Sequence, residues 1–359
     1  MSRPFTIKDV AKEAGVSIGT VDRVLHNRGR VSDANMKAVT AAVKKLNYHP
    51  SQIARALVNR KSNLRIGITY PRVDSDFWSE MPGGIEAAKK KLMPFGVELV
   101  IDHTETYDVR DQIASIDKLV GLGVSGLVFT SVDDSSADQL EKHIPEGIPY
   151  ATVVNPAASV SRCAFHLGPD DFQLGMLAAR LISLFCGERC SLVVLAPNYK
   201  FNGTQRRIAG VLSKINQDLP GINLLKVIPV SGVTDEDIRA HLYSAATETL
   251  GTFPSLDALY VSNGFFDQAA FAIRDAFPDS KVKVFGHEFT TALPDLIARG
   301  IVAATIYQKP AEQWYRAIVM LSELLSDKRV VTAQDVRVEC SIIMKETLPA
   351  IDIGGIRLP

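Results

Sequence analysis

The sequence lacks the features that would assign its 359 residues to a membrane or an exported class. No apolar run reaches the length of a bilayer span. The amino-terminal stretch MSRPFTIKDVAKEAG carries charges along its whole length and has no apolar centre of a signal peptide. These absences favour a cytoplasmic protein without membrane contact, and the length favours two or three domains.

Cysteine is scarce, and its spacing excludes the common metal sites. The four cysteines, Cys163, Cys186, Cys190 and Cys340, form no CxxC pair. Cys186 and Cys190 are four residues apart, but two thiols alone make a poor metal site. We therefore predict buried free thiols, with no metal and no cofactor.

The signatures of several enzyme classes are also missing. There is no P-loop, no HExxH and no GxSxG motif. GLGVSG at 121–126 matches GxGxxG, yet it follows an expected helix and precedes an expected strand, which reverses the order of a dinucleotide site. Ser115 and Lys118 match SxxK without the other motifs of that chemistry, and His287 beside Glu288 has no visible nucleophile. We predict that the chain is not an enzyme.

Net charge is absent overall but divides unevenly along the chain. Residues 1–60 hold eleven Lys and Arg against four Asp and Glu, a charge of +7. The remaining 299 residues hold twenty-nine basic and thirty-six acidic residues, a charge of −7. A small basic segment joined to a larger acidic one is typical of a chain whose one end binds a polyanion, and nucleic acid is the natural candidate.

The basic segment has the pattern of three short helices. Thr6 and Asp9 form a capping box before the first helix, and Gly15 suits its left-handed end. Ser17 and Ser32 are the expected N-caps of the second and third helices. This spacing predicts a helix-turn-helix, the alternative being a small helical bundle with no DNA-binding role. The apolar residues expected to point inward from the third helix are Met36, Val39, Val43 and Leu46.

The runs TIKDVAKEAGVSIGTVDRVLHNRGRVS and LNYHPSQIARAL make the prediction specific. They carry AGVS, TV-x-RVL and LNY-x-P elements, and they resemble the lactose/galactose-repressor (LacI/GalR) family over nearly the whole basic segment. The resemblance implies a helix-turn-helix DNA-binding domain at 1–49, a hinge helix or linker at 50–61 and an effector-binding domain at 62–359.

By that resemblance, the helix that begins after Ser17 enters the major groove. Ile18 and Gly19 occupy the main base-reading positions, but neither can form a bidentate hydrogen bond to a base. Asp22 departs from the family, which usually has Ser there; it either pairs with an arginine such as Arg23 or Arg28 or turns away from DNA. The head residues implied to contact DNA are Thr6, Ser17, Ile18, Gly19, Thr20, Arg23 and Arg30.

The hinge is amphipathic and basic but too short to be a stable helix alone. The resemblance implies that it folds on DNA and pairs with its dimer mate in the minor groove. There Leu57 would wedge between base pairs, with Ala54 and Arg55 lining the groove. We therefore expect a homodimer on a pseudo-palindromic double-stranded operator.

Residues 62–359 alternate short β-rich runs with helical stretches. Nine strand candidates, from LRIGITY to VAATIYQ, predict two doubly wound parallel sheets with helices on both faces. The resemblance extends to a type I periplasmic-binding-protein fold with two lobes joined by three crossovers. The expected N-lobe is about 62–166 and 304–331, and the C-lobe about 167–303 and 332–359.

Polar and aromatic residues follow successive expected strands, where parallel sheets bind ligands. Aromatic planes beside planar polar groups suit a sugar or sugar derivative as effector, with a purine or another metabolite as the alternative. Arg207 matches the family's R-x-x-G, Gly264 replaces a common Asp, and Glu288 replaces an Asp. We predict a sugar-controlled transcriptional regulator, by family default a repressor; the alternative is a periplasmic-type sugar-binding protein of a transport system. The predicted effector residues are Phe77, Trp78, Asp133, Asn155, Arg207, Asn263, Glu288 and Gln308.

Overall fold

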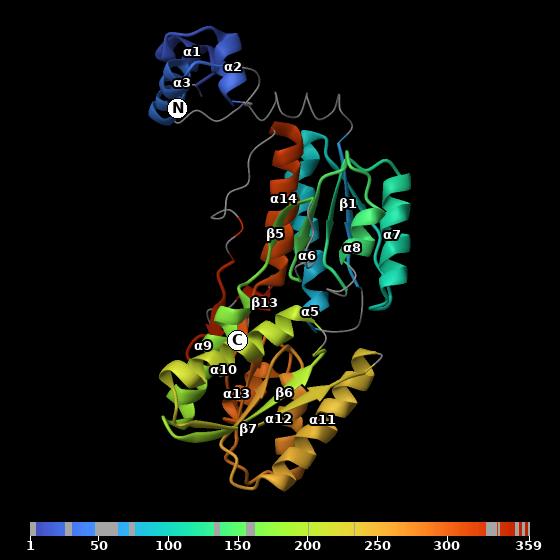
Figure 1. Ribbon diagram of the computed structural model, residues 1–359, viewed down its shortest axis with the longest axis vertical. Helices are drawn as coiled ribbons and strands as arrows, with labels where there is room; N and C mark the ends of the chain where they lie inside the picture. The colour runs from blue at the N-terminus through green and yellow to red at the C-terminus, as the bar shows by residue number, and fades with distance from the viewer. Residues whose placement is uncertain are drawn as a thin grey trace.

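A computed structural model shows a head of three short helices and a body built on two parallel β-sheets (Figure 1). No helix among the residues it describes is long and apolar enough to cross a bilayer. The described residues are 5–25, 31–46, 64–71, 76–132, 137–155, 162–199, 201–232, 234–327, 336, 338–348, 352–353 and 356–357.

The three helices of the head begin at the residues that the N-caps predict, and the first helix ends at the predicted glycine. The Asp9 carboxylate accepts from both the backbone N and the hydroxyl of Thr6, at 2.7 Å each. Gly15 ends the first helix with φ of 66°. The Ser17 and Ser32 hydroxyl oxygens accept backbone N–H bonds from the first turns of the next two helices. The helices are α1 (Ile7–Ala14), α2 (Ile18–Leu25) and α3 (Asp33–Lys45).

A small apolar core joins these three helices. Val39 is fully buried, and Val43 and Leu46 are partly buried beside it, as the helical spacing predicts. Met36 was expected to point inward, and that prediction is wrong because its side chain is 43% exposed. The apolar core of the head contacts α3 from Val39 onward, so Met36, in the first turn of α3, lies beyond the edge of the core.

The N-lobe contains a five-stranded, fully parallel sheet in the order β2-β1-β3-β4-β5. The last strand was not predicted, because CAFHL is short and interrupted by a histidine. The strands are β1 (Arg65–Thr69), β2 (Glu98–Ile101), β3 (Gly126–Phe129), β4 (Tyr150–Val153) and β5 (Cys163–Leu167). The helices are α5 (Asp76–Ser79), α6 (Met81–Leu92), the 3-10 turn η1 (Met93–Phe95), α7 (Val109–Gly121), α8 (Ala137–Lys142) and α14 (Pro310–Asp327).

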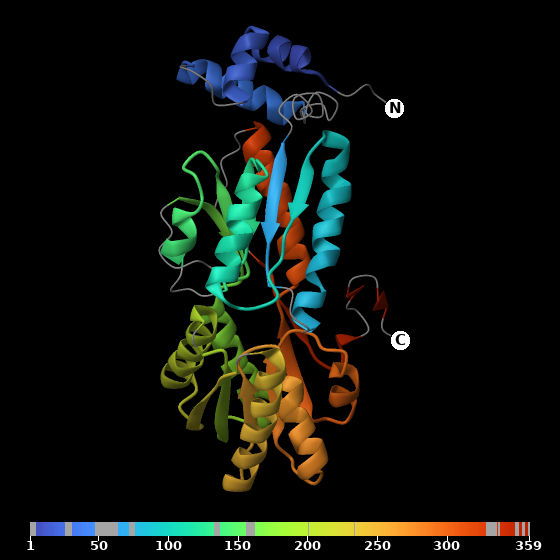
Figure 2. The same cartoon turned by 90° about the vertical axis from the view of Figure 1, so that its right-hand side faces the viewer.

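Helices cover both faces of this sheet, so its three central strands, β1, β3 and β4, are almost entirely buried. Helices α6 and α14 lie on one face of the sheet, and α7 and α8 lie on the other (Figure 2). The apolar side chains of each pair pack against the strands. Gly84 allows α6 to approach α14 closely, because a Cβ there would lie 2.0 Å from the Ala311 carbonyl oxygen.

The C-lobe contains a six-stranded sheet in the order β11-β10-β9-β8-β6-β7. It is parallel except for β11, a short strand that the alternating pattern did not predict and that pairs antiparallel with β10. The strands are β6 (Cys190–Pro197), β7 (Ile222–Val230), β8 (Ala258–Val261), β9 (Lys283–His287), β10 (Val302–Tyr307) and β11 (Ser341–Ile343); β12 (Asp352–Ile353) and β13 (Ile356–Arg357) form a separate pair. The helices are α9 (Asp171–Cys186), α10 (Asn202–Asp218), α11 (Asp235–Thr252), α12 (Phe266–Ala276) and α13 (Leu293–Ala298).

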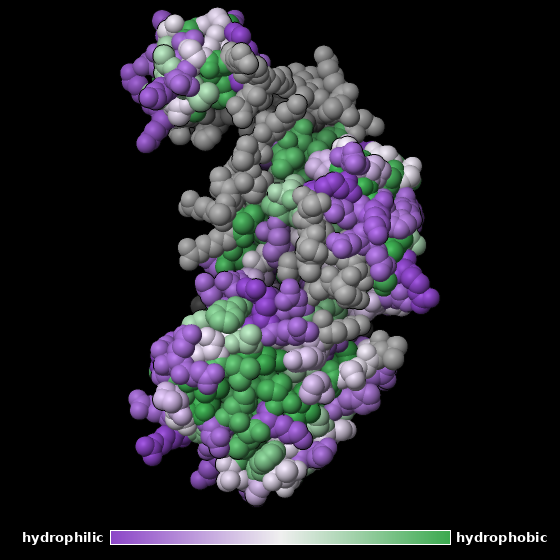
Figure 3. All heavy atoms as spheres, in the orientation of Figure 1, coloured by the Kyte–Doolittle hydropathy of each residue, from purple (hydrophilic) through white to green (hydrophobic). Residues whose placement is uncertain are grey.

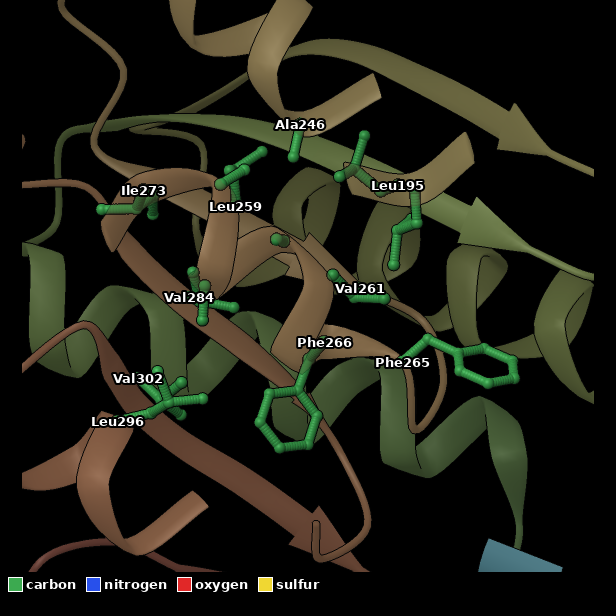
Figure 4. Packing of buried hydrophobic residues seen from close by; sticks show 14 of the residues in the cluster. Leu195, Ala246, Leu259, Val261, Phe265, Phe266, Ile273, Val284, Leu296 and Val302 are labelled. Atoms are coloured by element: carbon green, nitrogen blue, oxygen red, sulfur yellow. The ribbon is translucent and has the colours of Figure 1, made fainter. Parts of the chain in front are cut away.

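The C-lobe core also has two layers. Helices α9 and α10 cover one face of the sheet, and α11, α12 and α13 cover the other. The side chains of Phe265 and Phe266, at the start of α12, point in different directions (Figure 4). The Phe266 ring lies among the side chains of the strands, and the Phe265 ring points away from the Phe266 ring. The four cysteines are free, as predicted, although Cys190 is fully buried and the others only partly.

The chain crosses between the lobes late in the sequence. Although β10 belongs to the C-lobe sheet, α14 directly after it packs beside α6 in the N-lobe (Figure 1). The crossover that we expected at about residue 304 therefore follows Tyr307. Because β11 pairs with β10, the chain then returns to the C-lobe.

Candidate functional site

A cavity of about 110 Å³ lies between the two lobes. Six of its polar residues lie within two residues of the carboxyl end of a strand, in both sheets, because the carboxyl ends of parallel strands meet at one edge; these are Ser131, Asn155, Asn198, Asn263, Glu288 and Gln308. Seven of the eight predicted effector residues line this one cavity; Asp133 lies outside the described residues. The seven are Phe77, Trp78, Asn155, Arg207, Asn263, Glu288 and Gln308.

Backbone strain gathers at this cavity. Four non-glycine residues of the described chain have positive φ, and each stands just beyond the end of a strand. Val154, Asn198 and Glu288 line the cavity, with φ of 66°, 52° and 73°, and Lys309 directly follows a lining residue. Such conformations persist where the surrounding structure holds them in place, and they are enriched at functional sites.

Arg207 of α10 is held by three hydrogen bonds to the protein. Its Nε donates to the Asp171 carboxylate at 2.7 Å, and its Nη1 donates to the Ser262 carbonyl oxygen at 2.9 Å. Its Nη2 donates to the Gln308 side-chain oxygen at 3.2 Å. The guanidinium is thus fixed in the cavity wall, with a few N–H groups left for a ligand.

Glu288 is buried against Arg207 and Gln308. Its carboxylate accepts from the Gln308 backbone N at 3.3 Å and from the Gln308 side-chain amide. Burial raises the pKa of Glu288 from 4.5 to about 8, although the Arg207 charge opposes the shift. A Cβ at Gly264 would lie 3.5 Å from the Glu288 Cγ, so the small residue at 264 and the long acid at 288 share one space.

Aromatic side chains close the cavity and connect the lobes. The Trp78 indole N–H donates to the Tyr107 hydroxyl at 2.8 Å, and that hydroxyl donates to Asp235 of the C-lobe at 3.2 Å. The Tyr107 ring also meets Phe201 of the C-lobe at 6.3 Å between centroids. A second bond between the lobes joins the Tyr307 hydroxyl to Glu80 at 2.5 Å.

Several lining residues were missed by the sequence reasoning. Asn198 and Ser131 follow strands, a signal that was available, whereas the others lie in loops or helices with no local motif. The missed lining residues include Tyr107, Ser131, Asn198, Phe201, Thr204, Arg239, Phe265 and Phe289.

The residues weighed for enzyme chemistry have structural contacts. The Ser115 hydroxyl donates to the Thr69 hydroxyl at 2.8 Å, and Lys118 pairs with Asp102. His287 is fully buried, its Nε2 lies 2.7 Å from the Tyr260 hydroxyl, and burial lowers its pKa well below the ordinary value. None of these three side chains, Ser115, Lys118 and His287, lines the cavity.

The predicted DNA-contacting residues of the head lie on one end of α2 and beside α1. Ser17, Ile18, Gly19 and Arg23 are exposed, and polar side chains cover much of the visible head surface (Figure 3). Arg23 donates to the Gly19 carbonyl oxygen of its own helix at 3.1 Å. Thr6 and Thr20 are half-buried by capping contacts, while Arg30, Ala54, Arg55 and Leu57 lie outside the described residues.

Comparison with known families agrees with this division into head and body. Residues 6–51 match the model described as bacterial regulatory proteins, lacI family. Residues 66–329 match the periplasmic binding protein domain. The chain belongs, over most of its length, to the periplasmic binding protein domain family, and its head is a DNA-binding domain of the lacI family of bacterial regulatory proteins. It is a DNA-binding regulator whose body has the periplasmic-binding-protein fold.

Two relatives of this lacI-family regulator illustrate the range of the similarity. It is 27% identical to the ribose operon repressor of Bacillus subtilis over 293 residues, which is 79% of the chain and 81% of the relative. It is 34% identical to the transcriptional regulator DegA of the same organism over 150 residues, which span 41% of the chain and 43% of DegA.

Solved structures support the fold of the body. The regulator superposes on a carbohydrate-transporter solute-binding protein from Agrobacterium radiobacter, in complex with D-arabinose, with a TM-score of 0.69 and 19% identity. That superposition covers 80% of the chain and 96% of the other protein. A glucose-galactose binding protein from Geobacillus stearothermophilus gives 0.67 and 21%, over 80% and 99% of the two chains.

Proposed function

We propose that this lacI-family regulator represses transcription and that a sugar or sugar derivative, bound between the lobes, changes its affinity for the operator. The observation that carries the proposal is that seven of the predicted effector residues, drawn from both lobes, line the same cavity. Aromatic planes and fixed amide, carboxyl and guanidinium groups suit a small polyhydroxylated ligand. The names of the ribose and sucrose operon repressors favour the same class.

The DNA side of the proposal is a homodimer on a pseudo-palindromic site. Two copies of α2 would enter successive major grooves, while the hinges pair between them with Leu57 as the wedge. Phosphate contacts from the basic head release counterions, so operator affinity should fall steeply as salt rises. Coupling to the effector is expected to change that affinity by about 5- to 150-fold.

The experiment begins by selecting binding sites from random duplex DNA with the full-length protein. Fluorescence anisotropy on a selected site is then repeated with each member of a sugar library. We expect two half-sites related by a two-fold axis, and at least one sugar that shifts the apparent Kd. Sites without two-fold symmetry would refute the dimer, and affinities unmoved by every sugar would refute the sugar-controlled repressor.

A sugar-binding protein of a transport system is the second candidate, because the solved neighbours of the body are such proteins. The lacI-type head favours the regulator, since a transport protein has no use for a DNA-binding domain. Cell fractionation separates the two: the regulator is expected with nucleoid-associated protein, and recovery from the periplasm would favour transport.

A further inference from the structure

Two arginines line the cavity, and the protein holds them differently. All three nitrogens of Arg207 already donate to the protein, and its side chain is 11% exposed. Arg239, in the second turn of α11, is 28% exposed. Its Nη1 lies 3.4 Å from the Asp267 carboxylate, a long contact for an ion pair.

The Arg239 guanidinium is oriented by an aromatic ring. Its central carbon lies 5.2 Å from the centroid of Phe265, which also lines the cavity. Among the described residues, neither Nε nor Nη2 of Arg239 has a hydrogen-bond partner. The side chain therefore presents a planar fork of N–H donors, held in place and able to bind acceptors in the cavity.

The charges around Arg239 are consistent with an acidic ligand. Within the described part of the wall, Glu288 is the one carboxylic acid, and burial favours its neutral form. Asp267 and Asp235 are buried, and Asp235 accepts a hydrogen bond from the Tyr107 hydroxyl. The lining thus carries two guanidinium groups, and the carboxylates that contact them, Asp171 and Asp267, are buried behind the lining.

We propose that Arg239 is a specificity-determining residue that selects an effector carrying an oxyanion over the neutral sugar of the same skeleton. This inference rests on the proposed function. A guanidinium fork matches the two oxygens of a carboxylate or a phosphate, whereas a single hydroxyl engages only one of its donors. The effector class is therefore a sugar acid or a sugar phosphate, bound with its charged group against Arg239 and its ring against the aromatic side chains.

The test uses isothermal titration of the full-length protein with pentoses and hexoses, their aldonic and uronic acids, and their monophosphates. The measured quantity is the ratio of affinities for an acid or phosphate and for its parent sugar, taken within each variant. We expect a ratio of at least about tenfold in the unmodified protein, and a loss of about tenfold or more from that ratio in Arg239→Gln. Whether acids or phosphates give the higher ratio identifies the source of the oxyanion.

Arg206→Gln is the matched control. Arg206 also contacts an aspartate, Asp170, at 3.4 Å, but it lies on the surface and does not line the cavity. It should keep the ratio of the unmodified protein. Arg239→Lys keeps the charge and loses the fork, so an intermediate ratio is expected, and this variant serves if Arg239→Gln does not fold.

The outcomes separate the two proposals. If neutral sugars bind as tightly as their acids and phosphates, or if the ratio survives Arg239→Gln, the role of Arg239 is refuted while the sugar-controlled regulator stands. If no member of the three ligand classes binds, both proposals fail.

Discussion

The two lobes of the body share one frame and differ in what they bring to the cavity. In each lobe a pair of helices crosses closely at a glycine. A Cβ at Gly84 would lie 2.0 Å from the Ala311 carbonyl oxygen, and one at Gly175 would lie 1.9 Å from the Arg207 carbonyl oxygen. Of these two crossings, the second places a residue that lines the cavity, so packing and recognition are coupled in the C-lobe.

The side chains at the cavity divide in the same way. The described N-lobe lining holds aromatic, aliphatic, amide and hydroxyl side chains, such as Trp78, Val132 and Asn155, and no charged one. The C-lobe supplies both guanidinium groups and the buried acid. We infer that the C-lobe selects the polar groups of a ligand, whereas the N-lobe covers the ligand. Hydrogen bonds between the lobes then stabilise the arrangement in which the two lobes are closed over the ligand.

The largest effect on stability and on effector binding is expected when Arg207 of the C-lobe is replaced. Arg207→Ala leaves the buried Asp171 carboxylate without its cation, so the free energy of unfolding should fall by about 3–5 kcal/mol, and effector binding should be lost. Urea unfolding and calorimetric titration measure the two effects. The surface variant Arg206→Ala should cost less than about 1 kcal/mol. Equal losses in the two variants would contradict the buried network.

The two glycine crossings offer a second test. Gly175→Ala should cost about 1–3 kcal/mol, because backbone atoms at 1.9 Å cannot yield without a shift of α10. That shift carries Arg207 with it, so effector affinity should also fall. Gly84→Ala should destabilise the protein comparably and reduce affinity less, since it separates α6 from α14. Thermal unfolding and titration distinguish them, and identical affinity losses would argue against an uneven division between the lobes.

Much of this arrangement was predictable because it is local. Thr6, Ser17 and Ser32 cap helices through hydrogen bonds to residues three positions away, so the local sequence pattern is enough to predict these caps. Asn155, Asn263, Glu288 and Gln308 follow apolar strands, and parallel packing alone brings such positions to one edge. The use of the seven residues as ligand contacts stays a prediction.

The rest depends on contacts between distant parts of the chain. Tyr107 meets Asp235 across 128 positions of sequence, and Arg239 lies in a helix where its spacing resembles that of any solvated arginine. The C-lobe assignment of β10 depends on its pairing with β9, which periodicity does not reveal. Met36 shows the converse, since an apolar residue at helical spacing is exposed where the core is small.

The buried acid of the C-lobe predicts a pH effect. Because burial raises the pKa of Glu288 to about 8, the folded protein retains a proton that the unfolded chain releases near 4.5. The free energy of unfolding should therefore fall as pH rises from about 5 to 8, by up to about 1.4 kcal/mol per unit from this group. Glu288→Gln should lack this contribution. Urea unfolding of both proteins across the window measures it, and parallel curves would count against the raised pKa.

The smallest expected effect concerns the hydrogen bond between the lobes from the Tyr107 hydroxyl to Asp235. Tyr107→Phe removes the hydroxyl that accepts from Trp78 and donates to Asp235, so the closed arrangement should lose about 0.5–1.5 kcal/mol and effector affinity should fall by about two- to tenfold. Tyr150→Phe is the control, because the Tyr150 hydroxyl donates to Glu141 at 2.8 Å within the N-lobe. It should cost similar stability and leave affinity unchanged. Titration measures the affinities, and small-angle scattering measures lobe closure. If both variants lose affinity equally, the bond across the lobes has no special part in closure, since only its position distinguishes it from the control.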